Sequence, residues 1–371
     1  MTQAESLGLS TKELVKWLEF GLVLSLGASL IGSPRDMGMV LGALLIAGAA
    51  EALYGLNQAR TGTGPAGFFL GGGVLRAFGT FGQPNPFAAY LATLLSLAVG
   101  MGLVLISQAR HQLVRPLGLL LLASGGLMLL AVMASLSRSA VLALGMSAGV
   151  MVALHHRRGL LLLALAALVG VSLLLLGGFG LLPPFLVTRV AELSQNFALF
   201  DARAVTLTSE NFALVQRMAI WQAAWEMFLD HPLLGVGLGN FDVVYPRYAL
   251  PGWPQLPGHA HNYYLNLLAE AGFLGLGAYL ALLAYLGTRL CQAARRLRSL
   301  LDQGGPNADV PQLYGVTLGA IGLLAVLTVH HLFDNLYVHG MMTQVGLILG
   351  LGLAAPEVAA RAAKKGSGET Q

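Results

Sequence analysis

Long uncharged apolar runs, separated by short clusters of charged residues, make up most of this chain. A bilayer core about 30 Å thick needs about 20 apolar residues of helix, whose backbone groups bond within the segment. Charged residues therefore mark the ends of spans. On this basis we predict nine spans, near residues 17–33, 37–56, 86–107, 116–136, 139–154, 159–182, 262–289, 313–335 and 339–356. The predicted fold class is all-α, a polytopic integral membrane helix bundle.

The first two predicted spans carry charged residues that the others avoid. Glu19 and Arg35 leave only about 15 uncharged residues between them, close to the lower limit for crossing a bilayer. Glu51 lies within the second span. We expect these segments to tilt, to snorkel their charges or to lie partly in the interface.

One long connection, residues 183–261, is large enough to fold outside the bilayer. Its apolar residues recur at three- and four-residue spacing, which predicts an amphipathic helix capped near Ser209-Glu210 and ending at Asp230. The stripe consists of Leu214, Met218, Trp221, Trp225 and Phe228. Its tryptophans suit the headgroup level, and we expect a tight glycine-rich turn at Gly235–Gly239 to follow.

The chain thus divides into four predicted parts. These are amino-terminal transmembrane helices (1–182), an external loop (183–261), carboxyl-terminal transmembrane helices (262–356) and a cytoplasmic tail (357–371).

Composition supports a membrane protein and excludes several other classes. Only 10% of residues are charged and 56% are apolar, whereas about a quarter of a soluble domain is charged. The single cysteine, Cys291, excludes an intramolecular disulfide and any multi-cysteine metal site. The net charge of +4 comes from scattered bases that are not gathered with aromatic residues, so we expect no nucleic acid partner.

Basic connections predict the orientation of the bundle. Lys and Arg in short loops stay cytoplasmic, and the connections at 110–115, 155–158 and 289–298 are basic and alternate correctly. The opposite, external side then holds Arg138 and the loop 183–261. The amino terminus is also predicted to be external although residues 1–16 resemble no signal peptide, so either the first segment does not span or the chain is part of a longer one.

Ionisable residues near membrane depth are the candidates for function, because each costs several kcal/mol unless it is partnered or faces water. By this orientation, six of the nine histidines and Arg76, Arg138 and Arg217 gather on the external side. Arg138 lies in a minimal turn, Ser135–Ser139. A guanidinium there is either a fork for an anion such as phosphate or a snorkelling headgroup anchor. Arg217 has the same two interpretations.

The segment from His261 to Glu270 opens the seventh predicted span. Asn262 is a plausible N-cap, which places His261 at the positive end of a helix dipole and disfavours the imidazolium form. His261 is therefore either a general base or a satisfied interfacial histidine. Glu270, on the polar stripe that follows, is an ion-pair partner, a proton relay or part of a structural buried pair.

Two further candidates lie near the outer end of the eighth predicted span. His331 and Asp334 share a helical face at a three-residue step. They could orient the base, hold an acceptor, or form a structural hydrogen bond with each other.

Three stretches resemble the motifs of a known family, the O-antigen ligase and polysaccharide polymerase superfamily of bacterial envelope proteins. They are Arg76–Phe81 with Pro84-Asn85-Pro86, the turn Ser137-Arg138-Ser139, and the long loop with its Arg217–Trp221, His231–Gly237 and His261-Asn262 motifs. In the last, His-Asn is followed after nine residues by Gly272 and after two more by Gly275. This looks like the family signature, and the resemblance covers roughly residues 70–340.

The resemblance implies a membrane glycosyltransferase, a ligase or polymerase, of the bacterial inner membrane with its active site on the periplasmic face. His261 would deprotonate an acceptor hydroxyl that attacks a glycan linked to undecaprenyl diphosphate, with inversion. Arg138 and Arg217 would bind the pyrophosphate, and no metal or cofactor is expected. Further substrate contacts would come from Arg76, Asn262, Glu270, His331 and Asp334. The acceptor would be a lipid or a polysaccharide, and membrane lipids would surround the protein.

A transporter or channel for a small anion or a proton-coupled solute is the competing hypothesis. Transporters commonly show repeated halves with helices broken at matching positions. The sequence shows no such repeat, and its polar residues gather on one side instead of crossing the bilayer.

Overall fold

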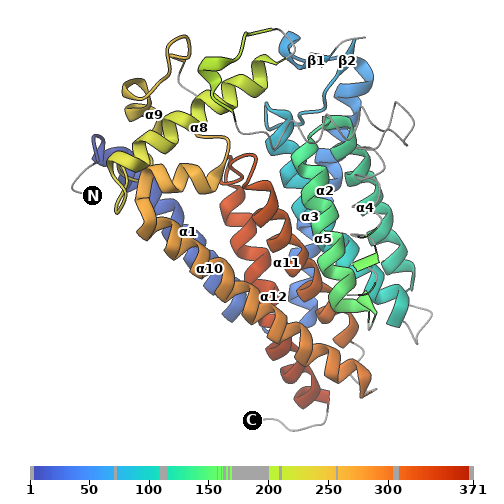
Figure 1. Ribbon diagram of the computed structural model, residues 1–371. Coiled ribbons are helices and arrows are strands. Elements are labelled where there is room, and N and C mark those ends of the chain that lie inside the picture. Colours follow the sequence, from blue (N-terminus) through green and yellow to red (C-terminus); the bar gives the residue numbers. More distant parts are fainter. Residues whose placement is uncertain are drawn as a thin grey trace. The chain divides into compact units, whose positions relative to one another are not determined.

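A computed structural model describes residues 4–70, 73–108, 115–156, 158–159, 161, 164–165, 168, 200–208, 211–255, 258–303 and 309–366. The described residues are almost wholly helical (Figure 1). The α-helices are α1 (Leu7–Ser29), α2 (Pro34–Thr61), α3 (Pro84–Gln108), α4 (Arg115–Ser135), α5 (Arg138–His155), α8 (Phe212–Asp230), α9 (Phe241–Val244), α10 (Tyr263–Asp302), α11 (Val310–His330) and α12 (Met341–Gly366). Short 3-10 turns cover Ala66–Phe68, Ala202–Ala204 and Tyr245–Arg247, and strand β1 (Phe69–Leu70) pairs antiparallel with β2 (Val74–Leu75).

Seven of the described helices are long and apolar enough to cross a membrane: α2, α3, α4, α5, α10, α11 and α12. This confirms the predicted polytopic helix bundle. The predicted span 159–182 lies largely outside the described residues, as do Arg110, Arg157 and the predicted cap Ser209-Glu210. Helix α1 covers the weak first prediction and is not among the seven, because its first turns carry Lys12, Glu13, Lys16 and Glu19.

Two predicted spans end elsewhere in the structure. Helix α10 continues to Asp302, beyond the predicted end at 289. Helix α11 ends at His330, earlier than predicted, because the N–H groups of Phe333 and Asp334 both donate to the His330 carbonyl and turn the chain. His331 and Asp334 therefore lie in a turn, and the prediction that they share a helical face was wrong.

The chain forms two compact units. Unit 1 contains Met1–Ser10 and Val152–Leu276, and unit 2 contains Thr11–Met151 and Gly277–Gln371. Unit 1 carries α8, α9 and the start of α10. Unit 2 carries α2, α3, α4, α5, α11, α12, most of α1 and the rest of α10.

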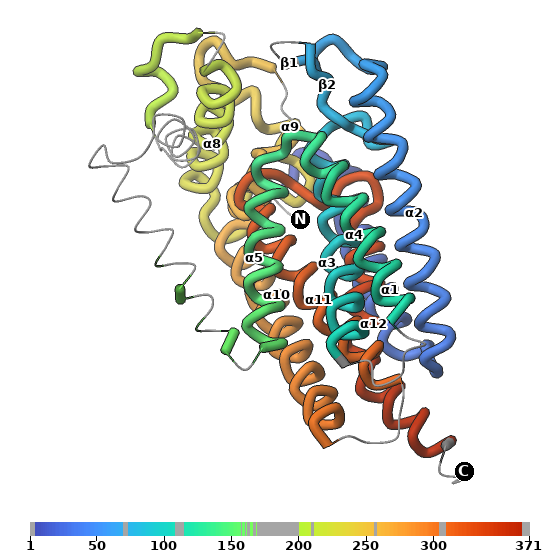
Figure 2. Tube along the Cα trace, turned by 90° about the vertical axis from the view of Figure 1, so that its right-hand side faces the viewer, coloured from blue at the N-terminus to red at the C-terminus, as the bar shows by residue number. Residues whose placement is uncertain are grey.

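Close backbone contact between helices forms the centre of unit 2. Helices α2, α3 and α4 lie side by side (Figures 1 and 2), and α11 packs on α3. A Cβ atom built on Gly100 of α3 would lie 2.6 Å from the Gly319 nitrogen of α11, and one on Gly319 would lie 2.7 Å from the Leu97 Cα. Small residues at this seam therefore let the two backbones touch, as is typical of membrane helices.

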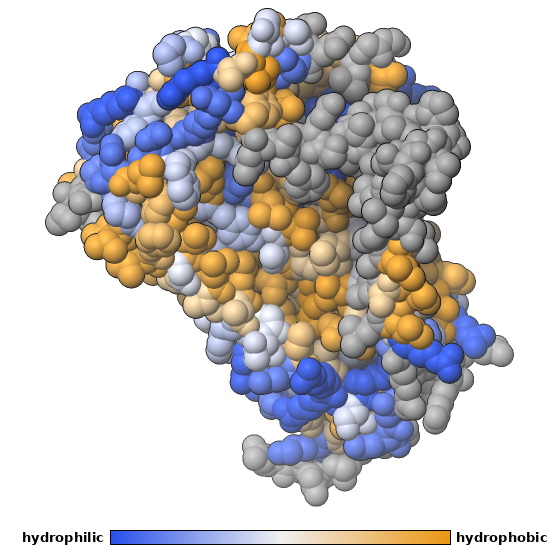
Figure 3. Space-filling model, in the orientation of Figure 1, coloured by the Kyte–Doolittle hydropathy of each residue, from blue (hydrophilic) through white to orange (hydrophobic). Residues whose placement is uncertain are grey.

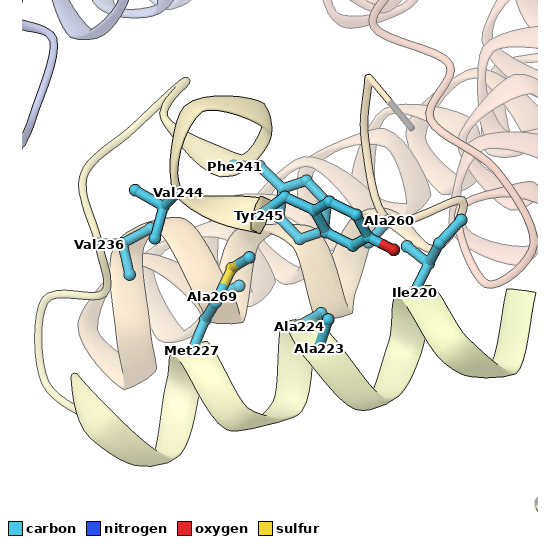
Figure 4. Packing of buried hydrophobic residues seen from close by; sticks show 10 residues of the cluster. All are labelled: Ile220, Ala223, Ala224, Met227, Val236, Phe241, Val244, Tyr245, Ala260 and Ala269. Carbon is cyan, nitrogen blue, oxygen red and sulfur yellow. The ribbon is translucent and has the colours of Figure 1, made fainter. Parts of the chain in front are cut away.

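Helix α8 in unit 1 forms as predicted. Met218 and Phe228 of the predicted stripe are buried, whereas Trp225 is 48% exposed. Short side chains, Ala223 and Ala224 among them, face the rings of the loop that follows (Figure 4). The cluster comprises Ile220, Ala223, Ala224, Met227, Val236, Phe241, Val244, Tyr245, Ala260 and Ala269. The small alanine side chains on this face leave room for the rings of Phe241 and Tyr245.

Candidate active site

The candidate residues divide between the two units. Arg217, His261, Asn262 and Glu270 belong to unit 1, and Arg76, Arg138, His331 and Asp334 belong to unit 2.

A break in helix α10 organises the group in unit 1. Gly272 has φ 63° and ψ −162°, which no helix contains. The break frees two carbonyls before it and two N–H groups after it, and the segment 232–237 binds all four. The bonds run from Val236 N to Ala269 O (2.9 Å), Gly237 N to Glu270 O (2.9 Å), Phe273 N to Pro232 O (2.9 Å) and Leu274 N to Leu233 O (3.4 Å). We call residues 232–237 the docking segment.

Two glycines make this pairing possible. A Cβ atom on Gly235, whose φ is 64°, would lie 2.2 Å from the backbone carbon of Glu270. A Cβ atom on Gly272 would lie 2.4 Å from the backbone of Leu233. The predicted tight turn is thus a contact between two backbones, and it explains why the motif needs glycine at both positions.

Glu270 takes part in the same assembly through its side chain. It is 7% exposed, and its Oε1 accepts a hydrogen bond from the Phe241 N–H at 3.0 Å. Phe241 opens α9, so the carboxylate fixes the chain that returns over α8.

Hydrogen bonds on both sides hold the segment that carries His261. Ala260 is fully buried; its N–H donates to Asn266 Oδ1 and its carbonyl accepts from Trp221 Nε1, each at 2.9 Å. Asn262 Oδ1 accepts from the Leu265 N–H at 3.1 Å, which confirms the predicted N-cap. His261 therefore stands between two fixed residues, directly before the first turn of α10.

His261 adopts an unusual backbone conformation. Among the described residues, three that are not glycine have positive φ: Leu136, His261 and His339. The φ of His261 is 49°, a left-handed value that costs about 1–3 kcal/mol outside glycine. Its N–H donates to His259 Nδ1 at 3.1 Å, and the two rings lie 4.4 Å apart. Such local strain, held by surrounding bonds, is typical of functional sites.

Arg217 lies on α8, which is hydrogen-bonded to the segment that contains His261. It is half-buried on α8, one turn before Trp221. Because Trp221 bonds to Ala260, the residue next to His261, this turn of α8 is held beside the histidine segment. Both predicted roles of Arg217, anion fork and lipid anchor, stay open.

Tyr248, close to α9, is unsuited to act as a base. Its hydroxyl donates to Asp230 Oδ2 at 2.8 Å, at the end of α8. Burial, with the adjacent carboxylate, raises the pKa of Tyr248 to about 12. The phenol therefore stays protonated at neutral pH and joins the loop to the helix.

In unit 2, a chain of hydrogen bonds links Arg76 to Asp334. The Arg76 Nε donates to the Ser135 carbonyl at 2.8 Å, and its terminal nitrogen donates to Asn85 Oδ1 at 3.2 Å. Asn85 Nδ2 in turn donates to Asp334 Oδ2 at 3.0 Å, and Asp334 is only 5% exposed. Arg76 and Asp334 are predicted from the sequence as separate site residues. In the structure, hydrogen bonds through Asn85 link them.

The turn between α4 and α5 forms as predicted. Arg138 is the exposed first residue of α5, and Leu136 before it has φ 55°. Ser139 Oγ lies 3.2 Å from His330 Nε2 at the end of α11. This contact fixes the turn to the end of α11. Arg138 lies at the N-terminus of α5, a position that favours anions.

His331 contacts two tyrosines in unit 2. Its Nδ1 lies 2.8 Å from the hydroxyl of Tyr279, which is 3.2 Å from that of Tyr337. The ring of Trp17 packs edge-on against both tyrosines, at 5.9 and 5.6 Å. This surrounds the fully buried His331 with aromatic side chains.

Sequence reasoning missed two residues that hold the Arg76 loop. Gln58 Nε2 donates to the Gly79 carbonyl at 3.0 Å and its Oε1 accepts from the Gly79 N–H at 2.8 Å. Glu51 Oε1 accepts from the Thr80 N–H at 2.6 Å. The two side chains lie seven residues apart on one face of α2, and this spacing of polar residues in an apolar helix is the signal that could have found them. Glu51 thus anchors a loop.

A comparison with protein families finds a match to part of the chain. The model of the O-antigen ligase family matches residues 123–280. Five candidates lie within this match: Arg138, Arg217, His261, Asn262 and Glu270. No curated protein matches the chain.

The match and the spanning helices support a multi-pass membrane protein of the glycosyl-transfer type. The family match confirms the predicted relationship to the O-antigen ligase superfamily and supports an O-antigen ligase- or polymerase-like membrane glycosyltransferase.

Proposed function

We propose that the protein transfers a glycan from undecaprenyl diphosphate to an acceptor hydroxyl. His261 removes the hydroxyl proton, the acceptor oxygen bonds to the anomeric carbon, and the bond from that carbon to the diphosphate breaks. Undecaprenyl diphosphate leaves with the electron pair, and a single displacement inverts the anomeric centre. The proton remains on His261 until solvent removes it.

The family match over residues 123–280 is the observation that carries this proposal, because it includes His261, Arg138 and Arg217. The held position of His261 before α10 agrees with it. A base acts best from a fixed position within hydrogen-bond reach of its proton, and Ala260 and Asn262 supply that fixation.

The arginines are proposed to stabilise charge on the leaving diphosphate. A guanidinium fork matches phosphate oxygens in two parallel bonds, so catalysis by Arg138 and Arg217 requires no metal ion. Arg76 is proposed to bind the donor as well, with Asn85 and Asp334 fixing its direction. Asn262, Glu270 and His331 complete the proposed site as positioning residues.

A release assay tests the proposal. Purified protein in lipid nanodiscs is given a glycan on undecaprenyl diphosphate together with candidate acceptors, and free undecaprenyl diphosphate and glycosylated acceptor are measured. We expect both products in equal amounts, and neither with His261→Ala. Movement of the intact donor or of a small solute across a sealed vesicle, with no glycan transferred, would instead favour the transporter hypothesis.

The proposed external position of the site has its own test. We place single cysteines at the exposed residues Thr206 and Gln303 in a Cys291→Ser background. In intact cells an impermeant thiol reagent should label the cysteine at Thr206 and spare that at Gln303. The reverse pattern would put His261 on the cytoplasmic side and contradict a donor presented on the outer leaflet.

A further inference from the structure

The carboxyl-terminal part of α10 is longer than a bilayer requires. From Gly272 to Asp302 the helix has about 30 residues and a length of about 45 Å at 1.5 Å per residue. The hydrocarbon core is about 30 Å thick. The last turns of α10 must therefore emerge from the hydrocarbon, and so must the end of α12, whose final turn contains Lys364 and Lys365.

The emerging part of α10 is amphipathic. Leu286, Leu290 and Leu297 are buried at 0–2% exposure, whereas Arg289 and Arg295 are exposed. One face thus packs on the protein and the other presents guanidinium groups.

Helix α12 extends the same surface. Arg296 of α10 forms a 2.7 Å ion pair with Glu357 of α12, which fixes the two helix ends together. Seven basic residues stand on these two ends against two acidic ones, Asp302 and Glu357. The basic residues, which we call the basic end surface, are Arg289, Arg295, Arg296, Arg298, Arg361, Lys364 and Lys365. Figure 3 shows hydrophilic residues gathered at this lower end, directly below a hydrophobic band.

We propose that the basic end surface binds the headgroups of acidic phospholipids in the adjoining leaflet. The charges follow immediately after apolar helix, so their depth matches that of lipid phosphates. Arginine is suited to phosphate oxygens, and long basic side chains reach the headgroup level while their stems cover apolar surface. By the positive-inside rule this is the cytoplasmic leaflet, whose anionic lipids attract basic segments. This inference does not depend on the proposed glycan transfer.

Native mass spectrometry of the detergent-purified chain can test the proposal. We compare phosphatidylglycerol with phosphatidylcholine of the same acyl chains, on the wild type and on a triple variant, Arg289→Gln, Arg295→Gln and Arg361→Gln. Each charge near an acidic surface corresponds to about a fivefold change in affinity. We expect tighter binding of phosphatidylglycerol by the wild type, and at least a tenfold loss of that binding in the triple variant.

Two controls keep the result interpretable. Arg60 is an exposed arginine in the last turn of α2 and is not part of the basic end surface. The Arg60→Gln variant should bind phosphatidylglycerol as the wild type does. Lysine at the three variant positions retains charge and should restore most of the binding, which separates charge from folding. Equal binding of the two lipids, an unaffected triple variant, or displacement of phosphatidylglycerol by an equal concentration of inorganic phosphate would each overturn the proposal.

Discussion

Each unit contains a segment near its candidate residues, and the two segments are held by different means. In unit 1, the docking segment and the broken helix α10 pair through their backbones, with glycines at the contact. In unit 2, the side chains of Gln58 and Glu51 on α2 form hydrogen bonds with the backbone of the Arg76 loop.

This difference determines which substitutions each unit tolerates. Contact between backbones depends on the absence of a side chain, so any larger residue damages it. Contact through a side chain depends on one group, so its removal costs the bonds of that group and leaves the rest in place. In unit 1, a substitution should therefore lower activity without disturbing folding only if it lies outside the paired backbones.

His261→Ala is the clearest such separation and has the largest expected effect. We expect folding and donor binding to persist while glycan transfer falls by about 10²–10⁴, the usual contribution of a general base. Transfer is measured in nanodiscs beside His156→Ala, an exposed histidine of the same unit. Equal activity of the two variants would remove the base assignment.

Gly235→Ala should break the backbone pairing of unit 1. Its Cβ would lie 2.2 Å from Glu270, at a φ of 64°, and we expect a loss of about 3 kcal/mol or more in the free energy of unfolding. Gly252→Ala is the matched control, since φ there is 88° but no atom lies within 4 Å; it should cost only about 1–2 kcal/mol. Thermal unfolding in detergent distinguishes them, and similar shifts would mean that the loop moves away at little cost.

Arg217→Lys and Arg138→Lys compare the two units directly, one arginine in each. Each lysine keeps the charge but loses the fork, so we expect transfer to fall about tenfold or more. Arg60→Lys serves as the control. If both lysine variants keep full activity, these arginines are headgroup anchors and the diphosphate binds elsewhere.

Gln58→Ala should give the smallest effect and test the side-chain anchoring of unit 2. Both backbone groups of Gly79 would lose their partner, at a cost of about 1–3 kcal/mol. Because the loop also carries Arg76, the KM for the donor should rise more than kcat falls. Asn57→Ala, at the exposed neighbouring position, should change stability by less than about 0.5 kcal/mol. A purely structural Gln58 would lower stability and leave KM unchanged.

The sequence predicts the spans and the turns that carry the candidates, since apolar runs and N-caps are local signals. Asn262 as an N-cap and the Ser135–Ser139 turn follow from a few adjacent residues, and both are found in the structure. The break at Gly272 could not be foreseen, because its cause is a segment some 35 residues away that bonds to the freed groups.

The same limit applies to pairings between distant residues. The link from Arg76 through Asn85 to Asp334 spans about 250 residues of chain, and spacing gives no sign of it. The packing of Ala223 and Ala224 on α8 follows the same limit, because the rings of Phe241 and Tyr245 that pack there belong to a later segment of the chain.

The glycine seam between α3 and α11 has a consequence for solvent access to the interior of unit 2. At this seam the Gly100 and Gly319 backbones are close enough that an added methyl carbon would overlap its neighbour. No water molecule fits between the two backbones at this contact. Solvent therefore cannot enter between α3 and α11 at these two glycines.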